Sequence, residues 1–165
     1  MPFLLKLFNG GVEHLVMRVV KAVNGDEGKA MEIAKSLGEW FTKEGLKNMK
    51  IDFRLNHLAV AIEANAVLGF LCYSSYCGRM LLMWMGVKKS KQRKGVGQKL
   101  IKWAEKEARK MGLNYIELET LPDEDDYAPY KQTRSFFYKN GFKRVLYKKA
   151  RVQGWDDQIV LEKWV

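Results

Sequence analysis

A short glycine-containing segment in the middle of the chain carries the residue types that bind phosphate groups. The segment Gln92–Gly97, Gln-Arg-Lys-Gly-Val-Gly, follows a nearly continuous apolar run and precedes apolar residues at helical spacing. A strand that turns through glycine into a helix leaves several backbone N–H groups unpaired at the positive end of the helix dipole. Because glycine has no Cβ, the backbone at Gly95 and Gly97 can approach a phosphate, while Arg93 and Lys94 supply positive charge. The segment therefore predicts a pyrophosphate site.

The spacing of this segment excludes two common nucleotide-binding loops. A Walker loop has the pattern Gly-x-x-x-x-Gly-Lys-Ser/Thr, and a dinucleotide-binding loop has three glycines in the pattern Gly-x-Gly-x-x-Gly. The segment has neither pattern. We therefore expect the pyrophosphate to belong to another kind of ligand.

The charged residues of the chain indicate what kinds of ligand to expect. There are 29 Lys and Arg against 19 Asp and Glu, a net charge of +10, which attracts anions. An acidic block at Asp123–Asp126 and the nearby Glu117 and Glu119 interrupt this basic character. The two glutamates share one face of an expected strand, where a general base and a solvated strand end both fit. An anionic ligand beside a cationic one is therefore expected.

The elements that must position these residues follow from apolar periodicity, and they alternate in the manner of an α/β (α+β) protein. Helical spacing predicts one helix or a pair of short ones over residues 30–40, a long helix over 96–111 that ends at Gly112, and a helix over 129–140. Strands are expected over residues 13–21, 57–63, 66–76, 80–87, 115–120, 142–148 and 158–164.

Length and composition fit one globular domain. The chain has 165 residues, of which 47% are apolar and 29% charged. The apolar run Met1–Phe8 is too short for a secretory signal, and no stretch has the length of a membrane span, which favours a cytoplasmic location and no membrane partner. With two cysteines and two histidines, we expect reduced thiols and no metal site.

Two motifs resemble those of the GNAT superfamily of N-acetyltransferases. The pyrophosphate loop of this family has the signature Gln/Arg-x-x-Gly-x-Gly/Ala, which Gln92–Gly97 meets. The signature Phe-x-x-x-x-Gly-Phe is met by Phe136–Phe142. The preceding Pro129–Arg134 resembles a subgroup with Pro-Tyr-x-x-Thr-Arg before the core of this helix. The resemblance covers residues 57–165, and the N-terminal third agrees only in its strand-then-helices order.

The resemblance implies a fold and a co-substrate. The fold would be a single domain over residues 1–165, with a mixed, mostly antiparallel sheet of about six to seven strands and about four helices. Its element order would be β-α-α-β-β-β-α-β-α-β-β. Acetyl-coenzyme A would bind with its pantetheine arm on the backbone of Met85 and Val87. Its pyrophosphate would bind the backbone of Gln92, Arg93, Lys94, Gly95, Val96, Gly97 and Gln98.

The resemblance also implies direct transfer of the acetyl group to a primary amine in a ternary complex, without a metal. Glu119 is the candidate general base. The tyrosine that often serves the family as general acid falls four residues before Gly141, where this chain has Phe137. Its neighbour Tyr138 is the candidate acid, although one residue turns a side chain by about 100° around a helix. Tyr130, water, or departure of an unprotonated thiolate are the alternatives.

Two other functions remain open from the sequence. Phe137 in place of the family's tyrosine favours a non-catalytic acyl-coenzyme A binding or sensor domain. The basic charge alone favours a nucleic-acid-binding domain, but no recognisable DNA-reading motif accompanies it. For the enzyme, a cationic amine acceptor is expected. The acceptor's identity and the oligomeric state, a homodimer included, are left open.

Overall fold

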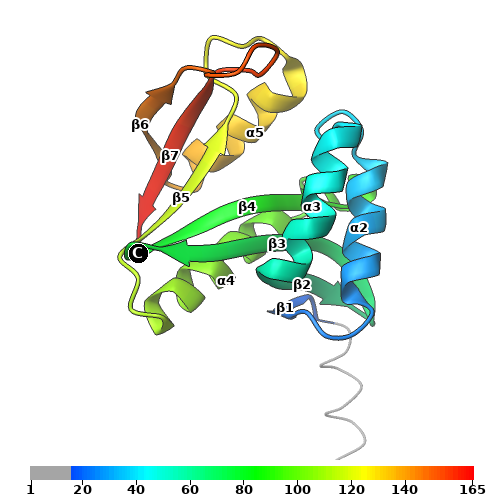
Figure 1. The fold of residues 1–165 in the computed structure, drawn as a ribbon. Coiled ribbons are helices and arrows are strands. Elements are labelled where there is room, and N and C mark those ends of the chain that lie inside the picture. Colours follow the sequence, from blue (N-terminus) through cyan, green and yellow to red (C-terminus); the bar gives the residue numbers. More distant parts are fainter. Residues whose placement is uncertain (1–15) are drawn as a thin grey trace, which may run out of the picture.

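The computed structural model describes residues 16–165 as one seven-stranded sheet with four α-helices (Figure 1). This confirms the expected mixed fold and its element order. The elements are β1 (Arg18–Lys21), α2 (Asp26–Ser36), α3 (Lys43–Leu55), β2 (His57–Glu63), β3 (Ala66–Tyr76), β4 (Arg79–Val87), the short 3-10 helix η1 (Lys89–Lys91), α4 (Val96–Lys110), β5 (Tyr115–Thr120), α5 (Ala128–Lys139), β6 (Lys143–Lys148) and β7 (Gln158–Trp164).

The N-terminal part differs from the sequence expectation in two places. β1 begins at Arg18, and the expected strand residues 13–15 lie outside the described residues. The second helix lies at Lys43–Leu55, beyond the expected stretch 30–40. It begins where the Thr42 side chain accepts a hydrogen bond of 3.0 Å from the Gly45 N–H, a helix cap that apolar periodicity does not report.

The strand order is β1-β2-β3-β4-β5-β7-β6, and every neighbouring pair is antiparallel except β4 and β5. These two are parallel because α4 connects them and returns the chain to the same end of the sheet. Two hydrophobic cores cover opposite faces of the sheet. One lies under α4 and α5, the other under α2 and α3.

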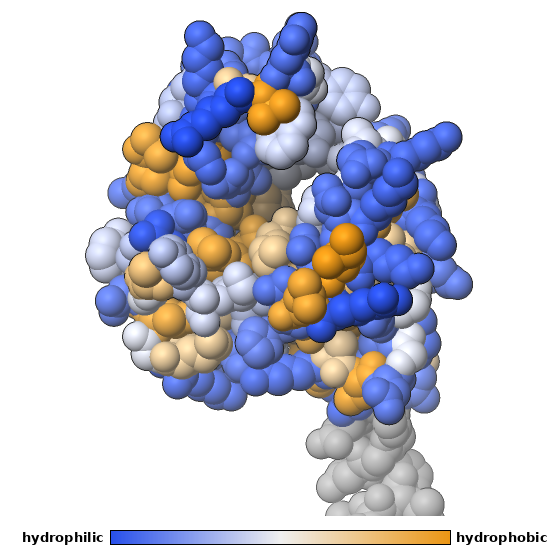
Figure 2. Space-filling view, viewed as in Figure 1, coloured by the Kyte–Doolittle hydropathy of each residue, from blue (hydrophilic) through white to orange (hydrophobic). Residues whose placement is uncertain are grey.

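Pairing between β4 and β5 stops partway along both strands. The register joins Arg79–Leu82 to Tyr115–Leu118 and goes no further. At the same level β4 bulges, because Tyr73 and Cys72 of β3 pair with Leu82 and Trp84 and leave Met83 as an extra residue. Beyond this point the strands diverge (Figure 1), and Figure 2 shows the surface hollowed between the two halves of the molecule. We call this hollow the β4–β5 cleft, with Met83–Val87 on one side and Glu119–Thr120 on the other.

A glycine in β3 keeps the sheet close to α4, and its replacement tests the packing. A Cβ on Gly69 would lie 2.8 Å from the Gly86 carbonyl oxygen and 3.2 Å from Val96 Cγ1. We expect Gly69→Ala to lower the free energy of unfolding by about 1–3 kcal/mol, because the obstructing oxygen belongs to the backbone. Gly28→Ala is the matched control. A Cβ on this residue of α2 would meet nothing within 4 Å, so stability should rise by up to about 1 kcal/mol. Urea unfolding of both variants measures the difference, and equal effects would contradict it.

Candidate active site

The side of β4 that faces the cleft has backbone groups that pair with no other strand. Lys88 N–H donates to the Leu68 carbonyl oxygen at 2.8 Å. Residues of an antiparallel pair alternate between bonding to the partner and pointing away from it, so Met85 and Val87 direct their N–H and C=O groups away from β3. The Gln92 side-chain amide accordingly reaches the Val87 carbonyl oxygen at 3.2 Å. These are the positions expected to pair with an extended pantetheine arm.

The loop after β4 ends at a free helix N-terminus. Arg93 and Gly95 both have left-handed backbone conformations, with φ of 58° and 82°. Gly95 is the N-cap of α4, and no side chain caps this helix end. The first turn of α4 contains no acidic residue, so the backbone N–H groups of Val96–Gln98 meet no competing carboxylate from their own turn. This helix end has the charge and the donors that bind phosphate.

The two glycines of the loop serve different purposes. At Gly95 a Cβ would meet nothing within 4 Å, so the positive φ, and not a lack of space, favours glycine there. At Gly97 a Cβ would lie 3.0 Å from Phe136 Cζ and 3.4 Å from Met85 Cε. Gly97 therefore lets the start of α4 pack closely on α5 and β4. This reason differs from the expected approach of a phosphate to its backbone.

Four of the five basic residues between β4 and α4 divide into two pairs. Lys89 contacts Glu39 at 2.8 Å, and Lys91 contacts Glu63 at 3.4 Å, so the neighbouring carboxylates partly neutralise both. Arg93 and Lys94 are exposed and have no ion pair within residues 16–165. Their charges remain available to an anionic ligand at the start of α4.

The structure separates the two candidate glutamates of β5. Glu117 lies in the paired segment of β4 and β5 and forms an ion pair of 2.7 Å with Arg79, with only 13% of its side chain exposed. Glu119 lies past the last residue that pairs with β4, and its side chain is 39% exposed and forms an ion pair with Lys148 of β6. Only Glu119 is therefore beside the cleft.

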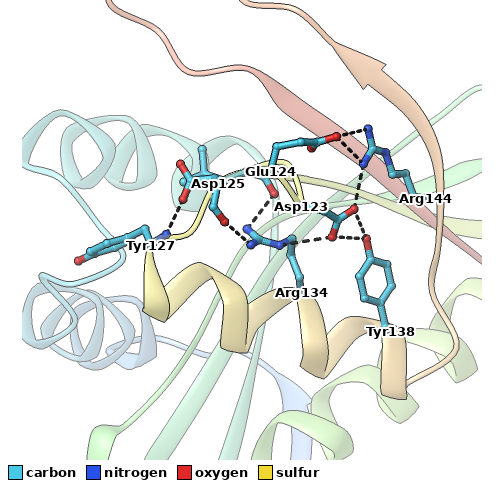
Figure 3. Close-up of polar contacts among 8 residues, drawn as sticks. Asp123, Glu124, Asp125, Tyr127, Arg134, Tyr138 and Arg144 are labelled. Atoms are coloured by element: carbon cyan, nitrogen blue, oxygen red, sulfur yellow. Dashed lines mark hydrogen bonds and ion pairs between the residues drawn. The ribbon is translucent and has the colours of Figure 1, made fainter.

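Tyr138 is held by the loop between β5 and α5. Its hydroxyl lies 2.9 Å from both carboxylate oxygens of Asp123, which also contacts Arg144 at 3.0 Å (Figure 3). Burial, and then the hydrogen bond and charge of Asp123, raise the pKa of Tyr138 to about 12. The hydroxyl thus donates to a carboxylate and keeps its proton. Tyr138 is two residues from Phe136, so their side chains leave α5 about 200° apart. Because Phe136 contacts the start of α4, Tyr138 points away from it.

Two arginines bind the loop that carries the acidic block Asp123–Asp126 and form ion pairs with two of its four carboxylates, Asp123 and Glu124. Arg134 is only 3% exposed and donates to the carbonyl oxygens of Leu121 and Asp125 at 3.3 and 2.6 Å. Arg144 binds Asp123 and also Glu124, at 3.3 Å (Figure 3). The block therefore helps to fix the loop. Because part of its negative charge is paired with arginine, it favours a cationic acceptor less strongly than the sequence alone suggests.

A contact between distant segments crosses the end of the cleft, and the sequence did not predict it. Trp40, between α2 and α3, donates from Nε1 to the Pro129 carbonyl oxygen and to Thr133 Oγ1, both at 3.2 Å. The Tyr130 hydroxyl in turn donates to the Trp40 carbonyl oxygen at 2.9 Å. The acceptors and donor on α5 come from the Pro-Tyr-x-x-Thr-Arg segment. The spacing of this segment could have indicated the contact, because it places Pro129, Tyr130 and Thr133 on one face of the helix.

The family of the chain follows from comparison with known proteins. The profile of the family described as Acetyltransferase (GNAT) domain matches residues 54–144, more than half of the chain. The chain belongs to this family of acetyltransferases. No curated protein sequence matches the chain.

Solved structures share the fold over nearly their whole length. A GNAT-family protein from Desulfovibrio desulfuricans is 24% identical with a TM-score of 0.77, over 90% of this chain and 99% of that one. The ribosomal-protein-S18-alanine N-acetyltransferase from Escherichia coli is 14% identical with a TM-score of 0.72, over 90% and 94%. The PaiA N-acetyltransferase from Thermoplasma acidophilum, solved with coenzyme A, is 19% identical with a TM-score of 0.69, over 91% and 99%. These similarities establish the fold.

The contact between Tyr138 and Asp123 leads to a prediction about the general acid. Because the hydroxyl donates to Asp123 and its pKa is raised to about 12, we expect Tyr138→Phe to change kcat by less than about twofold between pH 7 and 9. Steady-state kinetics with the best amine found would measure it. A fall of about tenfold or more, with unchanged affinity for acetyl-coenzyme A, would instead identify Tyr138 as the acid.

Proposed function

We propose that the protein is an N-acetyltransferase that moves the acetyl group of acetyl-coenzyme A to a primary amine. The observation that carries the proposal is the continuous path from the open side of β4 to the uncapped N-terminus of α4. Met85 and Val87 would pair with the pantetheine arm. The backbone from Gln92 to Gln98 would bind the pyrophosphate, with Arg93 and Lys94 beside it. The phosphate end and the thioester end of one ligand thus have complementary partners along this path.

The proposed reaction is a direct transfer within a ternary complex. A neutral amine nitrogen attacks the thioester carbonyl carbon, and the negative charge that develops on the oxygen is stabilised by backbone N–H near Val87. The carbon–sulfur bond then breaks and the coenzyme A thiolate leaves. The proton lost by the amine passes to Glu119, directly or through water. Glu119 suits this role because it is the β5 carboxylate that lies beside the cleft.

A non-catalytic acyl-coenzyme A binding domain is the second candidate. It is favoured by Phe137, because the family often has at this position a tyrosine that acts as general acid. The Phe137 side chain is 7% exposed and packs in the core with Phe142. Such a domain would bind acetyl-coenzyme A without turnover. Release of free thiol in the presence of a panel of primary amines, followed by mass spectrometry of the products, separates the two candidates.

The exposed charges of the loop give a test of binding. Acetyl-coenzyme A should raise the Tm, because a ligand at 100 times its Kd stabilises the native state by about 2.7 kcal/mol. ATP and NAD should not raise it at equal concentrations. We expect the double variant Arg93→Glu/Lys94→Glu to weaken acetyl-coenzyme A binding by at least about tenfold.

The matched control for this test makes the same charge change farther along α4. Lys102 and Lys106 are also exposed, and Lys102→Glu/Lys106→Glu should alter the Kd by less than about threefold because the distant charges are screened. Isothermal titration calorimetry measures both. Equal losses in the two double variants would show that net charge, and not the loop, controls binding.

The positions of the two glutamates give a test of catalysis. Glu119→Gln should lower kcat by about 10²-fold or more, because general base catalysis is typically worth that much. Glu117→Gln, two residues earlier on the same strand face, should retain kcat within about threefold since Glu117 is bound to Arg79. A Glu119→Gln variant with full activity would show that Glu119 is not the general base.

A further inference from the structure

Thr120, the last residue of β5, has a buried hydroxyl that the fold does not satisfy. The residue is 6% exposed, and its Oγ1 has no hydrogen-bond partner within residues 16–165. Buried hydroxyl groups in native proteins nearly always have a partner, since an unmade hydrogen bond lowers stability. No protein group among the described residues uses this hydroxyl, so it is available to a ligand.

The register places Thr120 where β5 has separated from β4, next to the cleft. Leu118 is the last residue of β5 that pairs with β4, and Thr120 follows two residues later on the same face of the strand. That face is covered by α4 and α5, because Leu118 belongs to the core that includes Phe137. Arg134 of α5 donates to the carbonyl oxygen of Leu121, the next residue, so α5 lies over this end of β5. Thr120 is thus between the diverging strands, on the side of Phe137.

Three hydroxyl groups of α5 already have partners inside the protein. Tyr138 donates to Asp123, and Tyr130 donates to the Trp40 carbonyl oxygen. Thr133 donates to the Pro129 carbonyl oxygen at 3.1 Å while it accepts from Trp40. Thr120 is therefore the buried hydroxyl of this region that is free to bond to a substrate.

We propose that the Thr120 hydroxyl donates a hydrogen bond to the coenzyme A sulfur and stabilises the thiolate as the carbon–sulfur bond breaks. This inference rests on the proposed function. The proton stays on Thr120 throughout, and the thiolate leaves as an anion that solvent protonates after release. A full acid is not needed, because a thiol with a pKa of about 8.5 is already a good leaving group. A hydrogen bond to an anion is about twice as strong as one between neutral groups, so it strengthens as charge develops on sulfur.

The test replaces Thr120 by valine, which has the same shape without the hydroxyl. We expect Thr120→Val to lower kcat by about tenfold to a hundredfold, the worth of a hydrogen bond to a charged group. The Kd for acetyl-coenzyme A should stay within about threefold, since the bond forms mainly as the thiolate develops. The Tm of the free protein should be unchanged or higher, because valine removes an unsatisfied hydroxyl. Thr120→Ser, which keeps the hydroxyl, should recover kcat to within about threefold of wild type.

The combination of a lower kcat with an undiminished Tm distinguishes this role from a structural one. A Thr120→Val variant with wild-type kcat overturns the inference and leaves the proposed function intact. A variant that loses kcat and Tm together, without recovery in Thr120→Ser, assigns Thr120 to packing and also overturns the inference. A wild-type protein that acetylates no amine overturns the proposed function, and the inference with it.

Discussion

Parallel pairing between β4 and β5 ends at Leu82 and Leu118, and the arrangement of the site depends on this interruption. The extra residue Met83 bulges β4 at the same level, so the strand changes direction while its pairing with β3 continues. Past the bulge, β4 keeps backbone donors and acceptors on a side that β5 no longer covers. A continuous sheet would have used these groups in its own hydrogen bonds, and the chain would have no extended surface for a ligand.

Contacts at both ends keep the diverging halves of the sheet together. At the closed end, one core contains side chains from both halves, among them Leu82 of β4 and Leu161 of β7. At the open end, Trp40 bonds to the start of α5. Because the cleft is braced at both ends, its width is set before any ligand binds, which reduces the entropy lost on binding.

Local signals in the sequence predict the parts of this arrangement that depend on neighbouring residues. Apolar periodicity and turn glycines predict the strands from residue 57 onward, and the position of Gly95 after an apolar strand predicts the glycine turn into α4. The contacts of Tyr138 with Asp123 and of Trp40 with Pro129 join residues 15 and 89 positions apart, and periodicity carries no information on such pairs. Gly97 is a further example. A glycine fits there because the residue packs closely against Phe136 on another helix, and the local sequence does not reveal that contact.

The most direct test of this account is amide hydrogen exchange with and without acetyl-coenzyme A. Groups that bind the ligand lose contact with solvent, so exchange should slow at Met85 and Val87 and along Val96–Gln98. The amides of Lys21–Gly25 line an open pocket at the N-terminal end of α2, away from the cleft, and should keep their exchange rates. Slower exchange at that pocket, with unchanged rates at Val87 and Val96–Gln98, would contradict the account.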